Sequence, residues 1–344
     1  MNPDMPGAVP ARSRIRIFFR WMRYLLTGLL CLLVALVCAG AVYEGIESHR
    51  DQQRFHPPGR LVDIGGYRLH LYCLGEGSPT VIQEAGGGNP WLSWYKVQPQ
   101  VASFTRVCSY DRAGLGWSDP SPRLPTAKVI AEELHTLLHN AGIPGPFVLV
   151  GHSLGGMYAR MFANQYPSEV SGMVLVDSSH ADQDERFPPE AKKLAAASYY
   201  VIRVMQFTLL IGLPRLLAAR AAPPEIRPEF SAVFCRWKFL AAVRAEAAAQ
   251  SESSAQVRSL GALGNLPLVV LSHDPDKMKF PGNLTEPVNR EWGKMQEELA
   301  HLSSNGSRLV VKGSSHDIQI DAPEAVVNAI HKVVGRVNLA SPAK

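Results

Sequence analysis

The chain has 344 residues, of which 46% are hydrophobic, and its formal net charge is +5. A chain of this length and apolar content can bury one large core, so we expect one α/β domain of about 250–280 residues with an appendage. The excess positive charge lies mostly near the N-terminus, at Arg12, Arg14, Arg16, Arg20 and Arg23. Nucleic-acid binding therefore has little support. The Cys and His residues lack zinc-like spacing, so we predict no metal site.

Residues 25–43 form an almost uncharged apolar run, long enough to cross a hydrocarbon core of roughly 30 Å as a helix. Arginines precede this run and mixed charges follow it. The positive-inside rule therefore predicts that residues 1–24 are a basic tail in the cytoplasm and that the residues after the apolar run are exported. The alternative is a signal peptide cleaved at the small residues 39–41, which would give a secreted protein. We favour an uncleaved single-pass anchor, because the run exceeds a usual signal-peptide core.

A polar segment, residues 44–60, ends in Pro-Pro-Gly and predicts a short tether before the folded domain. Residues 61–64 and 67–73 alternate between apolar and polar side chains. The intervening Gly65 and Gly66 are a two-residue hairpin signal. The sequence thus predicts that the domain begins with a β-hairpin.

A glycine-rich loop follows the predicted strand at residues 80–83, with the sequence Ala85, Gly86, Gly87 and Gly88. Consecutive glycines let the backbone adopt positive φ and let a ligand approach the amides. Its place after a strand is typical of a loop that stabilises an oxyanion. A plain flexible loop is the alternative.

The most informative motif is Gly151-His152-Ser153-Leu154-Gly155, which directly follows an apolar strand at residues 146–150 and precedes a helical pattern. A G-x-S-x-G sequence in this context is typical of a nucleophile elbow, a sharp turn that projects the serine hydroxyl away from the backbone. The glycines omit side chains that would clash in the turn. We therefore predict Ser153 as a nucleophile. The Leu154 N–H, at the N-terminus of the following helix, is a candidate donor to a developing negative charge.

Residues 110–118 read Tyr-Asp-Arg-Ala-Gly-Leu-Gly-Trp-Ser after a predicted strand, and Gly-His-Ser-Leu-Gly-Gly follows some forty residues later. Together these motifs resemble the α/β-hydrolase superfamily, over about residues 61–337. The resemblance implies that Asp111 and Arg112 are structural. It also implies a second oxyanion donor in the glycine-rich loop. The family usually has His-Gly there, whereas this chain has Ala-Gly, so either Gly86 or Gly87 can supply that N–H.

The alternation of strands and helices implies a mostly parallel, doubly wound α/β sheet, in which ligands bind at the carboxyl ends of the strands. We expect this core to comprise residues 61–180 and 265–338. Residues 181–264 interrupt the alternation with alanine-rich, proline-broken segments, where the family usually carries a helical cap.

Residues 198–217 are the most apolar part of this predicted cap. Arg203 and Pro214 argue against a second membrane span. We interpret the segment as a cap helix that packs on the core. The alternative is a lid that touches the bilayer surface or lines an acyl pocket.

His316 follows the last predicted strand, where the resemblance places the general base. Two aspartates compete as its partner. Asp177 ends the strand next to the elbow strand, and strands lie about 4.8 Å apart, so it can reach a histidine beside Ser153. Asp276 follows the penultimate strand, the family's usual position, but lies in a polar loop that must first be ordered. We favour Asp177 and keep Asp276 as the alternative.

These residues predict a serine hydrolase without a cofactor: Ser153 attacks, His316 transfers the proton and the aspartate orients the imidazole. A serine rather than an aspartate nucleophile disfavours epoxide hydrolase chemistry. The predicted substrate is a small apolar ester or amide, and we favour an ester, as for a carboxylesterase or lipase. The alternatives are an exo-acting aminopeptidase of the same fold and a catalytically silent binding module.

Cys73 and Cys108 lie in the second and fourth predicted strands. The resemblance makes these strands neighbours, and export would place them where disulfides persist. The two residues are therefore a disulfide candidate. The alternative is a pair of buried thiols that act as small hydrophobic residues.

Overall fold

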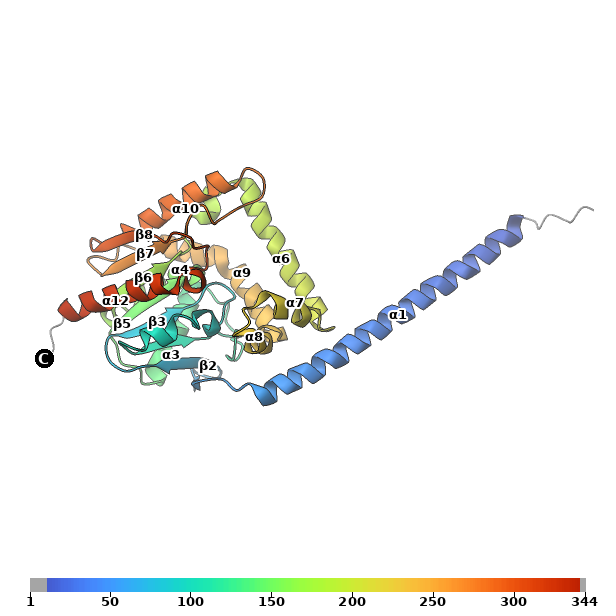
Figure 1. The fold of residues 1–344 in the computed structure, drawn as a ribbon, viewed down its shortest axis with the longest axis horizontal. Helices are drawn as coiled ribbons and strands as arrows, with labels where there is room; N and C mark the ends of the chain where they lie inside the picture. The colour runs from blue at the N-terminus through green and yellow to red at the C-terminus, as the bar shows by residue number, and fades with distance from the viewer. Residues whose placement is uncertain (1–10, 341–344) are drawn as a thin grey trace, which may run out of the picture.

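A computed structural model describes residues 11–340 as a central β-sheet flanked by helices, with one long helix that extends outward (Figure 1). Within these residues the sheet has eight strands in the order β1-β2-β4-β3-β5-β6-β7-β8. β2 is antiparallel to both of its neighbours, and the other neighbouring pairs are parallel. The mostly parallel α/β sheet predicted from the sequence is confirmed. The strands are β1 (Arg60–Asp63), β2 (Arg68–Leu74), β3 (Thr80–Glu84), β4 (Val107–Tyr110), β5 (Phe147–His152), β6 (Val170–Val176), β7 (Leu268–Ser272) and β8 (Gly306–Val310).

Helices cover both faces of this sheet. The apolar cluster on one face includes side chains from α3 (Ala127–Asn140), α4 (Leu154–Gln165) and α10 (Thr285–Ala300). The cluster on the other face includes side chains from α2 (Gln98–Val101) and α12 (Pro323–Ala340). The short elements of the core are η1 (Trp91–Trp94), η2 (Pro167–Glu169) and α11 (Ile318–Asp321). The sheet is therefore buried between two helical layers.

The central strand β5 contributes to both apolar clusters. Phe147 and Leu149 pack in one cluster, and Val148 and Val150 in the other, because successive side chains of a strand point to opposite faces. All four are at most 2% exposed. Burying each stabilises the fold by roughly 1.5–3 kcal/mol relative to an exposed position. Ser153 therefore follows directly on a strand that is fixed by packing on both sides.

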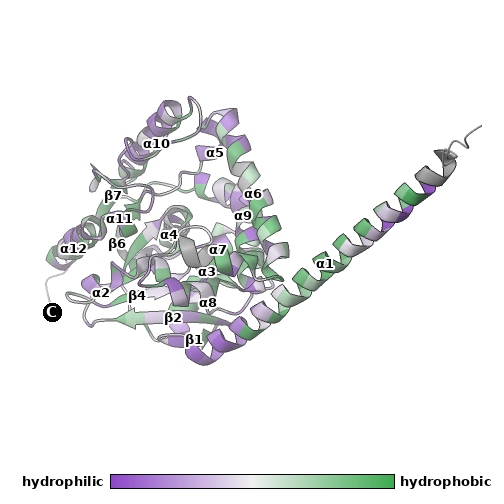
Figure 2. Cartoon of the chain, turned by 45° about the vertical axis from the view of Figure 1, so that its right-hand side comes forward, coloured by the Kyte–Doolittle hydropathy of each residue, from purple (hydrophilic) through white to green (hydrophobic). Residues whose placement is uncertain are grey.

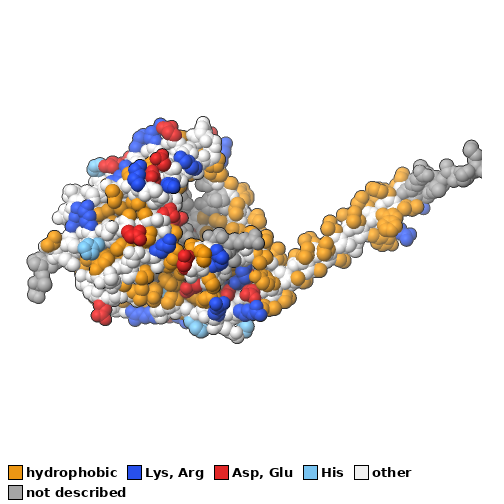
Figure 3. Space-filling view, in the orientation of Figure 1, with side chains coloured by type: hydrophobic (Ala, Val, Ile, Leu, Met, Phe, Trp, Pro, Cys, Tyr) orange, Lys and Arg blue, Asp and Glu red, His pale blue; other side chains and the backbone are white. Residues whose placement is uncertain are grey.

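The N-terminal helix α1 (Ala11–Arg54) is continuous and lies largely apart from the domain. Hydrophobic residues follow one another along it (Figure 2), and their side chains are exposed (Figure 3). Its most apolar 18-residue window has a mean hydropathy of 2.7, and none of that window is buried. By length and composition this helix can cross a membrane. The predicted basic tail is helical from residue 11, and its residues 1–10 lie outside the described residues.

The predicted tether at residues 44–60 is wrong for most of its length, because α1 continues to Arg54. The polar side chains of this part find partners within a helix. Glu44 and Asp51 both bind Arg215 of the cap, and Glu47 pairs with a basic residue one turn away. A polar composition indicated exposure but did not exclude a helix that packs against another part of the chain.

Residues 181–264 form helices between β6 and β7, as the predicted cap requires. They are α5 (Gln183–Arg186), α6 (Pro189–Leu209), α7 (Leu213–Ala221), α8 (Arg227–Phe234) and α9 (Trp237–Arg258). The apolar stretch at residues 198–217 is divided between α6 and α7 by a turn at Gly212, whose φ is 70°. It therefore forms two cap helices rather than one.

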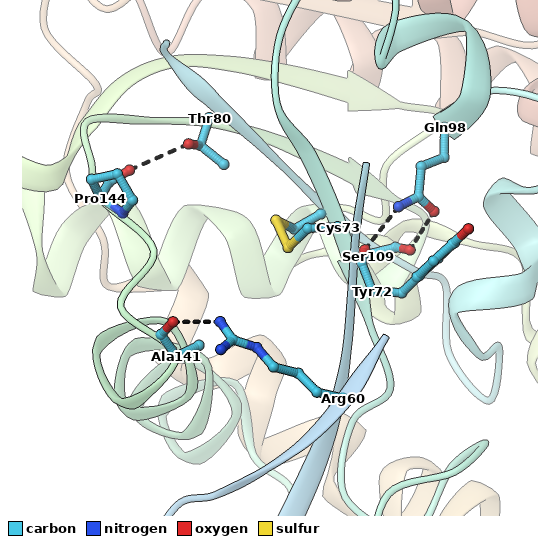
Figure 4. Close-up of a disulfide and its surroundings, with 9 residues drawn as sticks. Arg60, Tyr72, Cys73, Thr80, Gln98, Ser109, Ala141 and Pro144 are labelled. Atoms are coloured by element: carbon cyan, nitrogen blue, oxygen red, sulfur yellow. Dashed lines mark hydrogen bonds between the residues drawn. A yellow bond between two sulfur atoms is a disulfide. The ribbon is translucent and has the colours of Figure 1, made fainter. Parts of the chain in front are cut away.

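Cys73 on β2 and Cys108 on β4 are directly opposed and form a disulfide, with their Cα atoms 4.0 Å apart (Figure 4). The Gln98 side chain joins the same two strands. Its Nε2 donates to Tyr72 O at 2.8 Å, and its Oε1 accepts from Ser109 Oγ at 2.6 Å. Of the two alternatives for the cysteines, the structure thus contains the disulfide.

Reduction of this disulfide is expected to lower the Tm by roughly 5–15 °C. The bond joins residues 35 positions apart, and closing such a loop stabilises the fold by about 3–4 kcal/mol in the chain-entropy model. Calorimetry with and without dithiothreitol measures the shift. As a control, a Cys73→Ser, Cys108→Ser double variant should have the same Tm in both buffers. Alkylation of both residues in the denatured, unreduced protein would contradict the bond.

Candidate active site

Ser153 lies in the turn between β5 and α4, with φ 51° and ψ −124°. A positive φ is strained for a residue with a Cβ atom and persists only where the surroundings hold it. The glycines explain how this turn fits. A Cβ atom at Gly151 would lie 2.6 Å from Gly155 O, and one at Gly155 would lie 2.5 Å from Ala85 O. These close approaches are what a nucleophile elbow requires.

Three segments meet at the carboxyl edge of the sheet. Ser153 follows β5, Asp177 follows β6, and His316 lies in the loop after β8. His316 Nδ1 is 2.6 Å from Asp177 Oδ2. Ser153 and His316 line the same cavity. The structure thus brings together the serine, the histidine and the aspartate that the sequence analysis favoured.

Asp177 is completely buried and accepts four hydrogen bonds. Its Oδ1 accepts from the backbone N–H of His273 at 3.0 Å and from Trp292 Nε1 at 2.8 Å. Its Oδ2 lies 2.6 Å from His316 Nδ1 and 2.8 Å from His273 Nδ1. Because an ionised carboxylate only accepts hydrogen bonds, both rings carry a proton on Nδ1. In neutral His316, Nε2 is therefore unprotonated and able to accept a proton.

The surroundings shift the pKa values of this pair apart. Burial opposes the charge of Asp177, but hydrogen bonds from His273 and His316 outweigh it and hold the pKa of Asp177 below its usual value. Burial lowers the pKa of His316, whereas the hydrogen bond to Asp177 and its negative charge raise it, with a net rise. The His316 side chain is 33% exposed, so it still reaches the cavity. The carboxylate thus stays ionised near neutral pH, and His316 is a stronger base than an isolated imidazole.

His152, the residue before the elbow serine, packs against His316 with the ring centroids 4.8 Å apart. Its Nε2 donates to the backbone oxygen of His316 at 3.1 Å, and its Nδ1 accepts from Gln319 Nε2 at 3.3 Å. Burial and the charge of His316 lower the pKa of His152 to about 3. His152 is therefore neutral and holds the backbone of the loop that carries His316.

The glycine loop, residues 85–88, lies against the elbow. A Cβ atom at Gly87 would lie 2.6 Å from Leu154 Cδ1, and one at Gly86 would lie 2.8 Å from His152 Nδ1. Leu154 begins α4, so its N–H is at a helix N-terminus, where the dipole favours negative charge. The loop and the first turn of α4 are thus adjacent. Gly86 and Gly87 both remain candidates for the second N–H donor.

Arg112 holds the glycine loop from the interior. Its Nη1 donates to Ala85 O and its Nη2 to Gly86 O, both at 2.7 Å. The same guanidinium pairs with Glu84 of β3 at 2.7 Å and with Glu246 of α9 at 2.6 Å. All three charged side chains are 3% exposed. Arg112, which the resemblance made structural, therefore positions the glycine loop and connects it to the cap.

The alternative acid, Asp276, does not reach this site. It is exposed, and its backbone N–H donates to Asp274 Oδ1 at 3.2 Å. Among the described residues its carboxylate makes no hydrogen bond or ion pair with His316. The space beside Asp177 is occupied by the ring of His273, the first residue after β7. The geometry therefore does not support Asp276 as the acid.

A cavity of about 230 Å³ lies beside Ser153 and His316. It is smaller than the roughly 300–1,000 Å³ of pockets that hold drug-sized ligands, so it suits a short organic group. Among the described residues that line it, none carries a carboxylate. Its apolar walls include Phe187, Met278, Phe280, Val288 and Trp292.

Comparison with protein families matches residues 85–329, more than half of the chain, to the alpha/beta hydrolase family. The chain belongs to this family. An uncharacterized protein of Schizosaccharomyces pombe is 23% identical to this hydrolase over 315 residues. That match covers 80% of this chain, which spans only 56% of the length of the yeast relative.

Solved structures of similar fold include the epoxide hydrolase CorEH, with 18% identity and a TM-score of 0.63 over 81% of this hydrolase and 98% of that chain. An esterase from Thermogutta terrifontis has 23% identity and a TM-score of 0.57 over 79% of this hydrolase and 94% of that chain. At such identities the likeness shows the fold alone, and one fold can host several reactions. The type of reaction must therefore be argued from the site residues.

Sequence reasoning missed three residues at the site of this hydrolase. His273 and Trp292 donate hydrogen bonds to Asp177, and Glu246 Oε2 accepts from Gly88 N at 2.7 Å. The position of His273, directly after a strand at the carboxyl edge, was a usable signal. Trp292 and Glu246 lie on α10 and α9, and no sequence pattern showed that these helices would reach the site.

Proposed function

We propose that this protein is a serine hydrolase that cleaves a carboxylic ester through an acyl-enzyme. The supporting observation is the 2.6 Å contact of Asp177 with His316, beside a serine that is held at positive φ in the same cavity. A serine hydroxyl needs an adjacent base to act as a nucleophile at neutral pH. Membership of the hydrolase family agrees with this chemistry.

In the proposed mechanism, Ser153 Oγ attacks the ester carbonyl while His316 Nε2 takes its proton. The oxyanion accepts hydrogen bonds from the N–H of Leu154 and from that of Gly86 or Gly87. His316 then donates the proton to the leaving alcohol, and the C–O bond breaks to give the acyl-enzyme. Water then attacks the acyl-enzyme while His316 takes its proton. The proton passes to Ser153 Oγ as the acid is released. The aspartate stays ionised and maintains the imidazole tautomer. This chemistry needs no cofactor.

The site residues favour an ester over the other candidates. A serine rather than an aspartate nucleophile disfavours epoxide hydrolase chemistry. An aminopeptidase must bind the free amino group of its substrate, and a buried ammonium needs a charged partner. The described lining of the cavity offers no carboxylate for this purpose. Its apolar walls and small volume suit a short acyl group instead.

A panel of p-nitrophenyl esters of rising acyl length, beside aminoacyl-p-nitroanilides, tests this proposal. We expect turnover of the esters, with the highest kcat/KM among short acyl groups, and much slower turnover of the anilides. A fluorophosphonate probe labels only an activated serine, so labelling at Ser153 separates an enzyme from a silent binding module. Absence of both labelling and ester turnover would contradict the proposed function.

The pH dependence of kcat/KM is expected to show an acidic limb with an apparent pKa above the ordinary histidine value of about 6.5. Asp177 raises the pKa of His316, so His316 stays protonated to higher pH and cannot act as a base there. Activity should therefore rise with pH through this raised pKa. Titration of the released acid in a pH-stat measures the profile. An acidic limb below the ordinary value would be evidence against His316 as the base.

We further propose that α1 is an uncleaved membrane anchor, with its N-terminus in the cytoplasm and the hydrolase domain exported. Three observations support this topology. The helix is long and apolar enough to span a membrane. Arginines cluster before its apolar part. The domain contains the Cys73–Cys108 disulfide, and such bonds persist in oxidising compartments.

A reporter enzyme that is active only after export should be active when fused after Lys344 and inactive when fused after Arg23. Carbonate washing should leave the full chain in the membrane fraction, because a spanning helix is held by its apolar surface rather than by charge. N-terminal sequencing of the native protein provides the control. A chain that begins near Tyr43 would instead identify a cleaved signal peptide and a secreted hydrolase.

A further inference from the structure

The cap carries an exposed apolar surface on α6 and α7. Between residues 204 and 217 the only charged residue is Arg215, whose side chain is buried. Single exposed apolar residues are ordinary, but a contiguous set of them marks a surface that is covered by something. We call this set the apolar cap face. Its members are Tyr200, Val201, Val204, Phe207, Leu210, Leu213, Leu216 and Leu217, which are 39–72% exposed.

The turn between α6 and α7 touches α1 where the apolar run of α1 ends. A Cβ atom at Gly40 would lie 2.6 Å from Ile211 O, and one at Gly212 would lie 2.7 Å from the Tyr43 ring. Gly40 and Tyr43 are both within the last four residues of the segment predicted to lie in the membrane. The turn between α6 and α7 therefore lies at the level of the outer end of that segment. The α7 leucines of the apolar cap face line a hollow beside Tyr43 and the first polar turns of α1.

Arg215 fixes the cap to α1 in this arrangement. Its Nη2 lies 2.8 Å from Glu44 Oε1, its Nε 2.9 Å from Glu44 Oε2, and its Nη1 2.5 Å from Asp51 Oδ2. Glu44 and Asp51 are two helical turns apart, so they project from the same side of α1. The Arg215 side chain is 8% exposed, and breaking a buried ion pair is costly. The cap thus has a defined orientation relative to α1.

α6 runs crosswise to α1 in both ribbon views (Figure 1, Figure 2). Hydrophobic side chains lie along the edge of the domain that faces α1, with charged side chains among them where α1 joins the domain (Figure 3). A helix that crosses a membrane-spanning helix near its outer end lies along the plane of the membrane. Amphipathic helices in this position bury an apolar face about 5–10 Å into the boundary between headgroups and acyl chains.

We propose that the apolar cap face rests in the outer surface of the phospholipid bilayer that α1 spans. This inference depends on the proposed anchoring of α1. Lipid is the expected occupant rather than a second copy of the chain, because Ile211, in the turn between α6 and α7, lies against Gly40 in the exposed apolar part of α1. Arg203 is also exposed on α6, and its long side chain lets the guanidinium reach the headgroups while the helix lies flat.

Depth-dependent quenching tests this docking on the full chain in phosphatidylcholine vesicles. A nitrobenzoxadiazole fluorophore is attached to Phe207→Cys in a background with Cys31→Ser and Cys38→Ser. We expect nitroxide lipids labelled near the headgroup to quench it several-fold more than lipids labelled near the chain end. The matched control is Lys332→Cys, an exposed position on α12, on the opposite side of the domain from α1 (Figure 1). A label there should not be quenched.

A third label separates failure of the docking from failure of the anchor. Native Cys31 lies in the apolar part of α1. With Cys38→Ser it is the only exposed free cysteine among the described residues, because Cys235 is buried and Cys73 and Cys108 are joined in a disulfide. Quenching at Cys31 by nitroxides deep in the bilayer, without quenching at position 207, would overturn the docking and leave the anchor intact. Absence of quenching at both positions would remove the anchor as well. A blue-shifted but unquenched label at position 207 would show a protein partner, such as a second copy, and would also overturn the proposal.

A charge substitution provides the second test. Phe207→Glu is expected to abolish the quenching of a label at Leu213→Cys, because a carboxylate opposes burial in lipid. Turnover of a water-soluble p-nitrophenyl ester should stay unchanged, since Phe207 does not line the cavity beside Ser153. Undiminished quenching at position 213 in the Phe207→Glu variant would contradict docking through this face.

Discussion

Replacing Ser153 with alanine is expected to lower kcat for a p-nitrophenyl ester by on the order of 10⁴–10⁶-fold. In the proposed mechanism the substitution removes the oxygen that forms the acyl-enzyme, so the catalysis that remains comes from the oxyanion donors and from substrate binding. The backbone should be retained, because alanine keeps the Cβ atom and removes no hydrogen bond that holds the elbow. Steady-state kinetics on the purified full chain in detergent measures the loss.

Ser179→Ala is the matched control, because Ser179 lines the same cavity but lies after β6 rather than at the elbow. It should retain most of the activity and should still react with a fluorophosphonate, whereas Ser153→Ala should not. Equal Tm values for the two variants would show that the loss is chemical rather than structural. Turnover by Ser153→Ala near that of the unmodified chain would overturn the proposed function, since Ser153 alone among residues 11–340 follows a strand in a G-x-S-x-G turn.

The elbow could be predicted from the sequence because its requirements are local. Gly151 and Gly155 lie where neighbouring backbone segments leave no room for a Cβ atom. The structure shows these close approaches. The disulfide depended on a longer inference. Its two cysteines become neighbours only through the strand order, in which β4 separates β2 from β3. The resemblance to the hydrolase superfamily supplied that order, and the pattern of apolar residues alone did not.

The residues that were missed act through packing between segments distant in sequence. Trp292 reaches Asp177 because α10 packs beside β7, and Glu246 reaches Arg112 because α9 lies against Gly88 of the glycine loop. The pattern of apolar residues along the sequence predicts neither of these two contacts. The predicted tether failed for a similar reason, since its polar residues are helical and bind Arg215, which lies more than 160 positions away. Local composition shows that residues 44–54 are polar, but it does not show that they are helical or that they bind the cap.

Replacing Asp177 with asparagine is expected to lower kcat/KM by about 10⁴-fold, whereas Asp276→Asn should change it little. An asparagine amide can present N–H to His316 Nδ1, and the ring would then carry its proton on Nε2, the atom that must accept the proton of Ser153. Asp276 is exposed and makes no described hydrogen bond with His316. Replacing its carboxylate with an amide should therefore leave the imidazole tautomer unchanged. Kinetics on the two single variants, prepared in parallel, decides between the two aspartates.

Asp177 also accepts hydrogen bonds from His273 and Trp292, so its substitution carries a structural risk that Asp276→Asn lacks. A pH profile separates the two effects. The carboxylate is what raises the pKa of His316, and its loss should shift the acidic limb of the residual activity to lower pH. A variant that is only unstable would have lower activity at every pH, and its acidic limb would not shift. A large loss in Asp276→Asn with an unshifted profile in Asp177→Asn would assign the acid to the loop after β7, and the observed contact of Asp177 with His316 would then be structural only.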